Sequence, residues 1–158
     1  MHPSVATLTA VGEPGTFGSG PRSSGYISAA KSLVIGARVL AAAGADCAEA
    51  HGLVSGFAAE TLLKSLLAHA GMDEKALRSG SMKHDLIELW KRAAARTPLS
   101  SAAPPDWIEK LNTFHDKPYV VRYMKGVNAY VLPRSTDVQS GLESLLQTVI
   151  QHVSSGAA

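Results

Sequence analysis

The feature that most constrains the fold is residues 46–70, where apolar side chains cover almost the whole circumference of a predicted helix. A helix that is apolar nearly all round is usually central and buried. Gly71 follows it and stops it, and we expect Asp46, with Glu49 three positions later, to begin it as a capping box does. The apolar positions are Leu53, Val54, Phe57, Ala58, Leu62, Leu63, Leu66 and Leu67.

Four other segments have apolar residues at helical spacing and predict further helices around this central one. Pro98 closes the second of them, and Ser135 or Thr136 caps the last. The predicted fold class is therefore all-α, a bundle of four to five helices. The segments begin near Tyr26, near His84 or Asp85, around Asp106–His115, and after Ser135 with a stripe at Val138, Leu142, Leu145, Val149 and Val153.

Length and composition indicate one globular domain. The chain has 158 residues, 46% hydrophobic and 18% charged, with a net charge of +2 and a single cysteine, Cys47. One cysteine excludes a disulfide framework, and we expect it to be a small buried residue of the helix. Residues 1–24, rich in proline and glycine, predict a flexible arm; 25–153 form the domain and 154–158 a frayed tail.

The stretch KPYVVRYMKGVNAYVLP, residues 117–133, differs from the rest because proline, glycine, β-branched and aromatic residues crowd around Arg122. It predicts a small β-like or extended insertion, with a turn at the Lys-Gly pair. In an extended segment Arg122 shares a face with valine and points inward, where it could pair with Glu60. Alternatively, Arg122 binds an anion while tyrosines such as Tyr123 stack on a ring.

Glu60 and Lys64 are two charges in the middle of the apolar helix, four residues apart and in the favourable order. One interpretation is a simple surface ion pair. The other is a half-buried pair, which needs further partners because an unsatisfied buried carboxylate is costly. His84 and Arg122 are the predicted partners.

His84 lies in the sequence KHDLIELW, directly before a predicted helix. It either caps that helix or joins Glu60 in a polar cluster, where an imidazole can titrate near neutrality. Asp85 is expected to be a first-turn residue that favours the helix dipole. His115-Asp116 is read as a cap at a helix end.

The segments AAETLLKSLLAHAG and KHDLIEL, on a small helical bundle, resemble the HEPN superfamily (higher eukaryote and prokaryote nucleotide-binding domains). The matching positions are Ala58, Glu60, Lys64, His84 and Leu86, within residues 26–96. The resemblance implies a helical bundle, dimerisation through helices, and a role near RNA or nucleotides. Some members are metal-independent ribonucleases with an arginine followed a few residues later by a histidine.

This chain departs from the ribonuclease pattern, because Asn128 stands where a histidine would follow Arg122, and asparagine cannot act as a general acid or base. Arg78 and His84 have the required spacing but lie early in the bundle, so they are weak catalytic candidates. No phosphate-binding loop, nucleophile elbow or His/Cys metal spacing is visible. We therefore expect no cofactor and no metal site.

The functional hypothesis is a non-catalytic binding or interaction protein, a homodimer that contacts RNA, a nucleotide or a partner protein such as a nucleotidyltransferase-like protein. The site would comprise Glu60, Lys64, His84, Asp85, Arg122 and Tyr123. One alternative is a metal-independent ribonuclease of a toxin or defence system; another is a purely structural partner. No apolar run of membrane-spanning length and no signal peptide is evident, so a cytoplasmic protein without membrane contact is expected.

Overall fold

The computed structural model describes residues 22–99, 101–116 and 131–155, and this part of the chain is all-α. Five α-helices of nine residues or more are joined by one single-turn α-helix and two short 3₁₀ turns, which agrees with the predicted fold class. The helices are α1 (Arg22–Ala42), α2 (Ala48–His69), α3 (Glu74–Leu77), α4 (Leu86–Ala94), α5 (Asp106–His115) and α7 (Ser135–Ser155), with 3₁₀ turns at Ala45–Cys47 and Gly80–Lys83.

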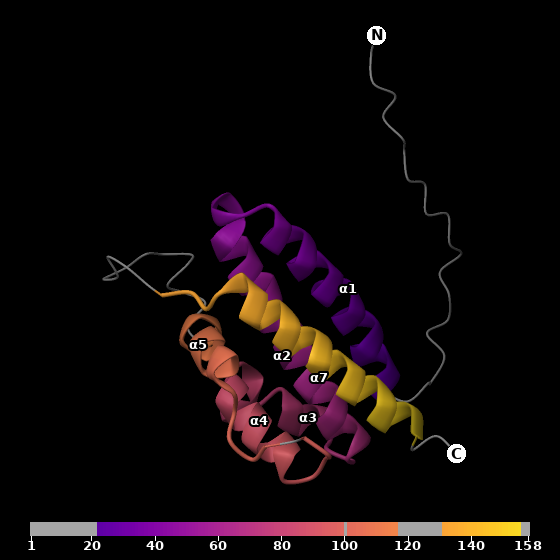
Figure 1. Cartoon of the computed structure of the whole chain (residues 1–158). Helices are drawn as coiled ribbons and strands as arrows, with labels where there is room; N and C mark the ends of the chain where they lie inside the picture. The colour runs from indigo at the N-terminus through magenta and orange to yellow at the C-terminus, as the bar shows by residue number, and fades with distance from the viewer. Residues whose placement is uncertain (1–21, 100, 117–130, 156–158) are drawn as a thin grey trace, which may run out of the picture.

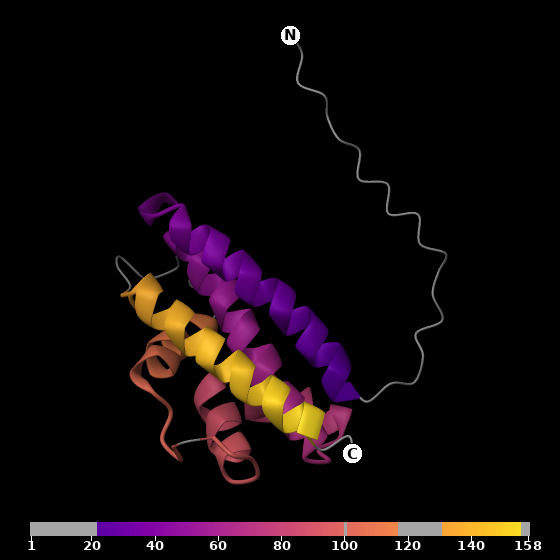
Figure 2. The ribbon, with the colours of Figure 1, turned by 45° about the vertical axis from the view of Figure 1, so that its right-hand side comes forward.

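The three long helices, α1, α2 and α7, all pack against one another. α1 runs antiparallel to α2, and α7 returns in the same direction as α2, so that the start of α1 and the end of α7 lie at the same end of the molecule (Figures 1 and 2). α1 and α7 pack on each other and on α2. α4 and α5 cover another side of α2. The central helix α2 therefore contacts α1, α4, α5 and α7.

The core consists mainly of aliphatic side chains from all five longer helices, centred on α2. Leu62, Leu63, Leu66 and Leu67 of α2 are fully buried, as an all-round apolar helix requires. The predicted stripe of α7 is buried at every position, from Val138 to Val153. Burying a leucine side chain contributes about 1.5–3 kcal/mol, so this core is the main source of stability.

Two polar contacts fix where α4 begins, next to the end of α5. The Asp85 carboxylate accepts hydrogen bonds from the Ile87 and Glu88 backbone N–H groups, which caps α4. The side-chain oxygen of Asn112 on α5 accepts the backbone N–H of Leu86 at 2.6 Å. His84 therefore sits immediately before a helix start that is anchored to a neighbouring helix.

The predicted capping box at Asp46 is wrong. Gly44 takes a left-handed φ of 80°, and Asp46 lies inside the 3₁₀ turn that follows it. α2 begins at Ala48, and its N-cap Cys47 makes no side-chain capping bond. The turn between α1 and α2 thus uses the conformational freedom of glycine rather than a carboxylate cap.

Several boundaries also differ from the sequence-based expectation. α1 begins at Arg22, earlier than Tyr26, and α7 continues to Ser155. Residues 72–83, expected to be a polar loop, contain α3 and a 3₁₀ turn because Asp73 caps α3 through the Ala76 N–H. Within the predicted insertion, residues 117–130 lie outside the described residues, and residues 131–134 form neither helix nor strand.

By length and composition alone, α1 could cross a membrane, because an 18-residue stretch of Ser23–Ala42 has a mean hydropathy of 1.2; 17% of that stretch is buried. Four serines and two basic residues, Lys31 and Arg38, interrupt the apolar run of this segment. α1 packs against α2 and α7, and Arg38 pairs with Glu143 of α7 at 2.7 Å. In this structure α1 is a bundle helix with one exposed side.

Candidate functional site: a buried glutamate with two histidines

Glu60 and Lys64 lie one turn apart on α2 and are almost completely buried, with 8% and 7% of their surfaces exposed. The Lys64 ammonium donates to Glu60 Oε1 at 2.6 Å and to the backbone carbonyl of Lys83 at 2.9 Å. The pair is therefore not a solvated helix-surface ion pair. It links α2 to the turn that precedes α4.

Two histidines from other segments complete the environment of the Glu60 carboxylate. His115 Nε2, at the end of α5, lies 2.6 Å from Glu60 Oε2, and His84 Nδ1, before α4, lies 3.1 Å from the same oxygen. We call Glu60, Lys64, His84 and His115 the Glu60 cluster. It joins α2, α5 and the α4 start through one carboxylate.

The protonation pattern of the two imidazoles follows from the carboxylate, because an ionised carboxylate only accepts hydrogen bonds. His115 must carry a proton on Nε2, and His84 must carry one on Nδ1. The second nitrogen of His84, Nε2, is then left for other partners. The His84 side chain is 37% exposed, whereas that of His115 is 2% exposed, so the cluster meets solvent through His84.

The pKa of the Glu60 carboxyl is lowered to about 2. Burial by itself would raise this pKa, because it disfavours the charged form. The hydrogen bonds from His115, Lys64 and His84 outweigh that penalty, together with the charge of Lys64. Glu60 is therefore an anion throughout the physiological range.

Gly56 makes room for His115, one turn before Glu60 on α2. A Cβ atom at this position would lie 2.5 Å from His115 Nδ1 and 2.9 Å from its Cγ, closer than real Cβ contacts. Phe57 packs edge-on against the same ring, with centroids 5.0 Å apart. The glycine and the phenylalanine thus hold the His115 ring between α2 and α5.

The structure brings together Glu60, Lys64 and His84 from the set of candidate residues in the sequence. The Asp85 carboxylate instead caps the start of α4. Arg78 pairs with Glu74 at 2.6 Å on an exposed surface, while His84 pairs with Glu60, so the two have different partners. Arg122 and Tyr123 lie outside the described residues.

His115 is the functional candidate that sequence reasoning missed, because a histidine at the end of a predicted helix resembled a cap. The expectation of no metal site also missed this residue, since Glu60, His84 and His115 are far apart in the sequence. Their ligand-type atoms all lie within 4.8 Å of one another. A small residue at 56, four before the buried glutamate, was the one local signal for a bulky partner there.

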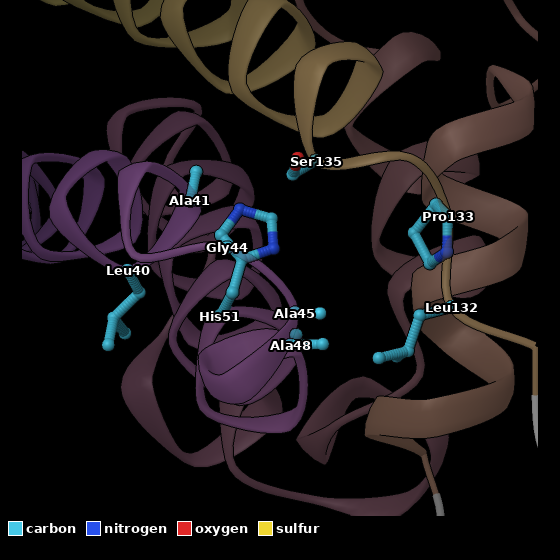
Figure 3. Close-up of a pocket in the computed structure, with 10 residues that line it drawn as sticks. Leu40, Ala41, Gly44, Ala45, Ala48, His51, Leu132, Pro133 and Ser135 are labelled. Atoms are coloured by element: carbon cyan, nitrogen blue, oxygen red, sulfur yellow. The ribbon is translucent and has the colours of Figure 1, made fainter.

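A second candidate is a cavity of about 210 Å³ at the start of α2, between the α1–α2 turn and the start of α7. Figure 3 shows the His51 ring at one side of this space, with Leu132 and Pro133 on the other side and Ser135 near its top. His51 lies 3.3 Å from the Ser55 hydroxyl, and burial lowers its pKa. Mostly small or apolar residues line the rest, so the cavity offers little to orient a charged ligand.

Comparisons of the chain with family models, with curated proteins and with solved structures find no match.

Proposed function

We propose that this chain is a HEPN-like binding protein that holds the phosphate groups of RNA or a nucleotide at the His84 edge of the Glu60 cluster, without cleaving the ligand. The observation that carries the proposal is the position of His84. Its Nδ1 is fixed by a buried carboxylate, and its other nitrogen belongs to a partly exposed ring. Such an imidazole is held in one orientation before a ligand arrives, which reduces the entropy cost of binding.

The surroundings of His84 suit an anion. Lys83 precedes it and is exposed, while its carbonyl is held by Lys64. The Lys64 ammonium already balances the Glu60 carboxylate, so a further proton on the histidine ring would give the edge a positive charge. Arg122 and Tyr123 are proposed as additional ligand contacts from the segment outside the described residues.

The test is a binding titration of short fluorescent RNA and of ATP in EDTA, comparing wild type, His84→Ala and His152→Ala. His152 is a partly exposed histidine of α7, so its replacement is a matched control. We expect at least tenfold weaker binding for His84→Ala and no change for the control. Equal binding by all three proteins contradicts the proposal, and a change in melting temperature alone supports a purely structural role.

A metal-independent ribonuclease is the second candidate, favoured by the Glu60–His84 pair. A carboxylate that orients a histidine through Nδ1 leaves Nε2 to accept a proton, which is the arrangement of a general base. Against it, Arg78 is paired with Glu74 rather than with this site. Cleavage of end-labelled RNA in EDTA by wild type and not by His84→Ala would establish the ribonuclease and replace the non-catalytic proposal.

The proposed homodimer uses the exposed side of α1. Ile35 and Val39 are 59% and 64% exposed, one turn apart on that side. A second copy of the chain presents the same surface and can cover both residues by a two-fold interface. Light scattering should give a dimer for wild type and a monomer for Ile35→Glu; a wild-type monomer would contradict this part of the proposal. A nucleotidyltransferase-like protein is the heterologous partner that the resemblance suggests.

A further inference from the structure

We infer that Glu60, His84 and His115 form a binding site for a transition-metal dication, with Zn²⁺ as the best chemical match. Two imidazole nitrogens and one carboxylate oxygen, with a position left for water, are a common ligand set for zinc. The inference goes beyond the proposed RNA or nucleotide binding and does not depend on it.

The donor geometry is close to what zinc requires. Zinc–ligand bonds of about 2.0–2.1 Å place neighbouring donors of a tetrahedral site about 3.3 Å apart. Glu60 Oε2 lies 3.1 Å from His84 Nδ1 and 2.6 Å from His115 Nε2. Each of the three residues offers one ligand-type atom, and these atoms all lie within 4.8 Å of one another, so small side-chain movements would complete the set.

The rest of the cluster supplies the outer contacts that a metal site needs. Lys64 binds Glu60 Oε1 at 2.6 Å, which leaves Oε2 as a single, oriented metal ligand. The His115 ring is held by its contacts with Gly56 and Phe57. The partly exposed His84 ring gives the ion a route from solvent.

Metal binding changes which of its two ring nitrogens carries the proton in each histidine. Without metal, the protons on His84 Nδ1 and His115 Nε2 point to the carboxylate. With metal, those nitrogens donate lone pairs, so each ring must carry its proton on the other nitrogen, or lose one if it was charged. The metal-bound form and the Glu60–His84 hydrogen bond are therefore alternative states of one site.

The test titrates Co²⁺ into the tag-free full chain, after treatment with a chelator and its removal, and follows the visible absorption of four-coordinate cobalt. We expect one Co²⁺ per chain, displaced by one Zn²⁺, with at least tenfold weaker binding in His84→Asn and Glu60→Gln. His84→Asn should remain folded, because this ring is partly exposed and outside a helix. Circular dichroism of each variant separates lost ligation from lost folding.

The matched control replaces one member of a different histidine pair. His69 and His152 lie with ring centroids 5.1 Å apart on α2 and α7 and could bind cobalt by themselves. His152→Asn should keep the spectrum and affinity of wild type. Absence of four-coordinate bands in wild type would overturn the inference, as would bands that persist in His84→Asn or disappear in His152→Asn. Since this assay contains no RNA or nucleotide, it can fail or succeed independently of the binding proposal.

Discussion

Two buried histidines lie along α2 and meet different partners: His51 belongs to its first turn, whereas His115, at the end of α5, packs against its middle at Gly56 and Glu60. His115 is 2% exposed and donates to the Glu60 carboxylate, whereas His51 is 5% exposed and lies 3.3 Å from the Ser55 hydroxyl. Burial lowers the pKa of His51, so the neutral ring is favoured there. At the other site, the hydrogen bonds from His115 and its neighbours lower the pKa of Glu60 to about 2.

The comparison shows that two buried histidines of one chain can lie in different electrostatic surroundings. An imidazole beside a hydroxyl and an apolar cavity is simply kept neutral, as at His51. An imidazole beside an ionised carboxylate has a fixed proton and a fixed orientation. The Glu60 cluster therefore combines charge, defined protonation and an opening to solvent through His84.

The largest expected effect is from Glu60→Gln, which removes the charge that the comparison depends on. The buried Lys64 ammonium then lacks a counter-charge, and the expected loss in the free energy of unfolding is about 3–5 kcal/mol. Urea denaturation measures it. Glu88→Gln is the matched control, since Glu88 pairs with Arg92 at the same spacing on an exposed surface. That control should lose no more than about 0.5 kcal/mol.

A double-mutant cycle sharpens this prediction. If the loss of stability in Glu60→Gln comes from the Lys64 ammonium, which is left without a counter-charge, then adding Lys64→Met should recover part of that loss. The expected coupling energy is about 0.5–3 kcal/mol. Independent, additive losses for the two substitutions would show that Glu60 and Lys64 do not stabilise each other.

Gly56→Ala should have the next largest effect, because the new Cβ would lie 2.5 Å from His115 Nδ1 and displace the ring. We expect a loss of about 1–3 kcal/mol, measured by thermal unfolding. Gly36→Ala is the matched control, since its Cβ would lie 3.6 Å from Val54 Cγ1, an ordinary contact. There alanine should stabilise the helix by up to about 1 kcal/mol. Equal effects at the two glycines would contradict the packing of His115 on α2.

Acid pH should weaken the fold through Glu60. Its pKa is about 2 in the folded chain, below the ordinary value of 4.5. The unfolded chain therefore takes up the proton first, so the stabilisation is complete above about pH 4.5 and is lost as the pH falls towards 2. Urea denaturation of metal-free protein between pH 5.5 and about 3 should show this decline. The decline should be smaller in Glu60→Gln; an unchanged slope would contradict the account.

Acidification should also weaken the fold through His51, by a smaller amount and in a pH range above that of Glu60. Because its pKa is below 6.5 in the folded chain, the unfolded chain binds the proton more readily as the pH falls through 6.5. Stability should therefore fall below this pH, and His51→Gln should reduce that part of the slope without changing the decline near pH 4. A His51 ring that titrates at or above 6.5 by NMR would contradict the comparison.

The helices were largely predictable because their apolar periodicity is strong. α5 has the predicted bounds, and the buried stripe of α7 was identified residue by residue. The start of α2 was not predicted correctly. Asp46 is a residue type that often caps helices, but the positive φ of Gly44 and the 3₁₀ turn place it before the helix. The local sequence does not show that the preceding 3₁₀ turn will include the residue that was expected to cap the helix.

The site was only partly predictable for a similar reason. Glu60 and Lys64 stood out as charges in an apolar helix, and their need for partners pointed to His84. His115 did not stand out, since its role depends on how α5 packs on α2 at Gly56. Contacts between segments that are distant in sequence are decided by packing, which one sequence does not reveal.

The most direct test of the Glu60 cluster is long-range ¹H–¹⁵N NMR of the imidazole rings in metal-free protein at mildly alkaline pH, with His84→Asn and His51→Gln for assignment. The account predicts that His84 is protonated on Nδ1 and His115 on Nε2, with both protons hydrogen-bonded to Glu60. Glu60→Gln should alter both rings and leave His51 unchanged. A His84 ring protonated on Nε2, with no response to Glu60→Gln, would contradict the account.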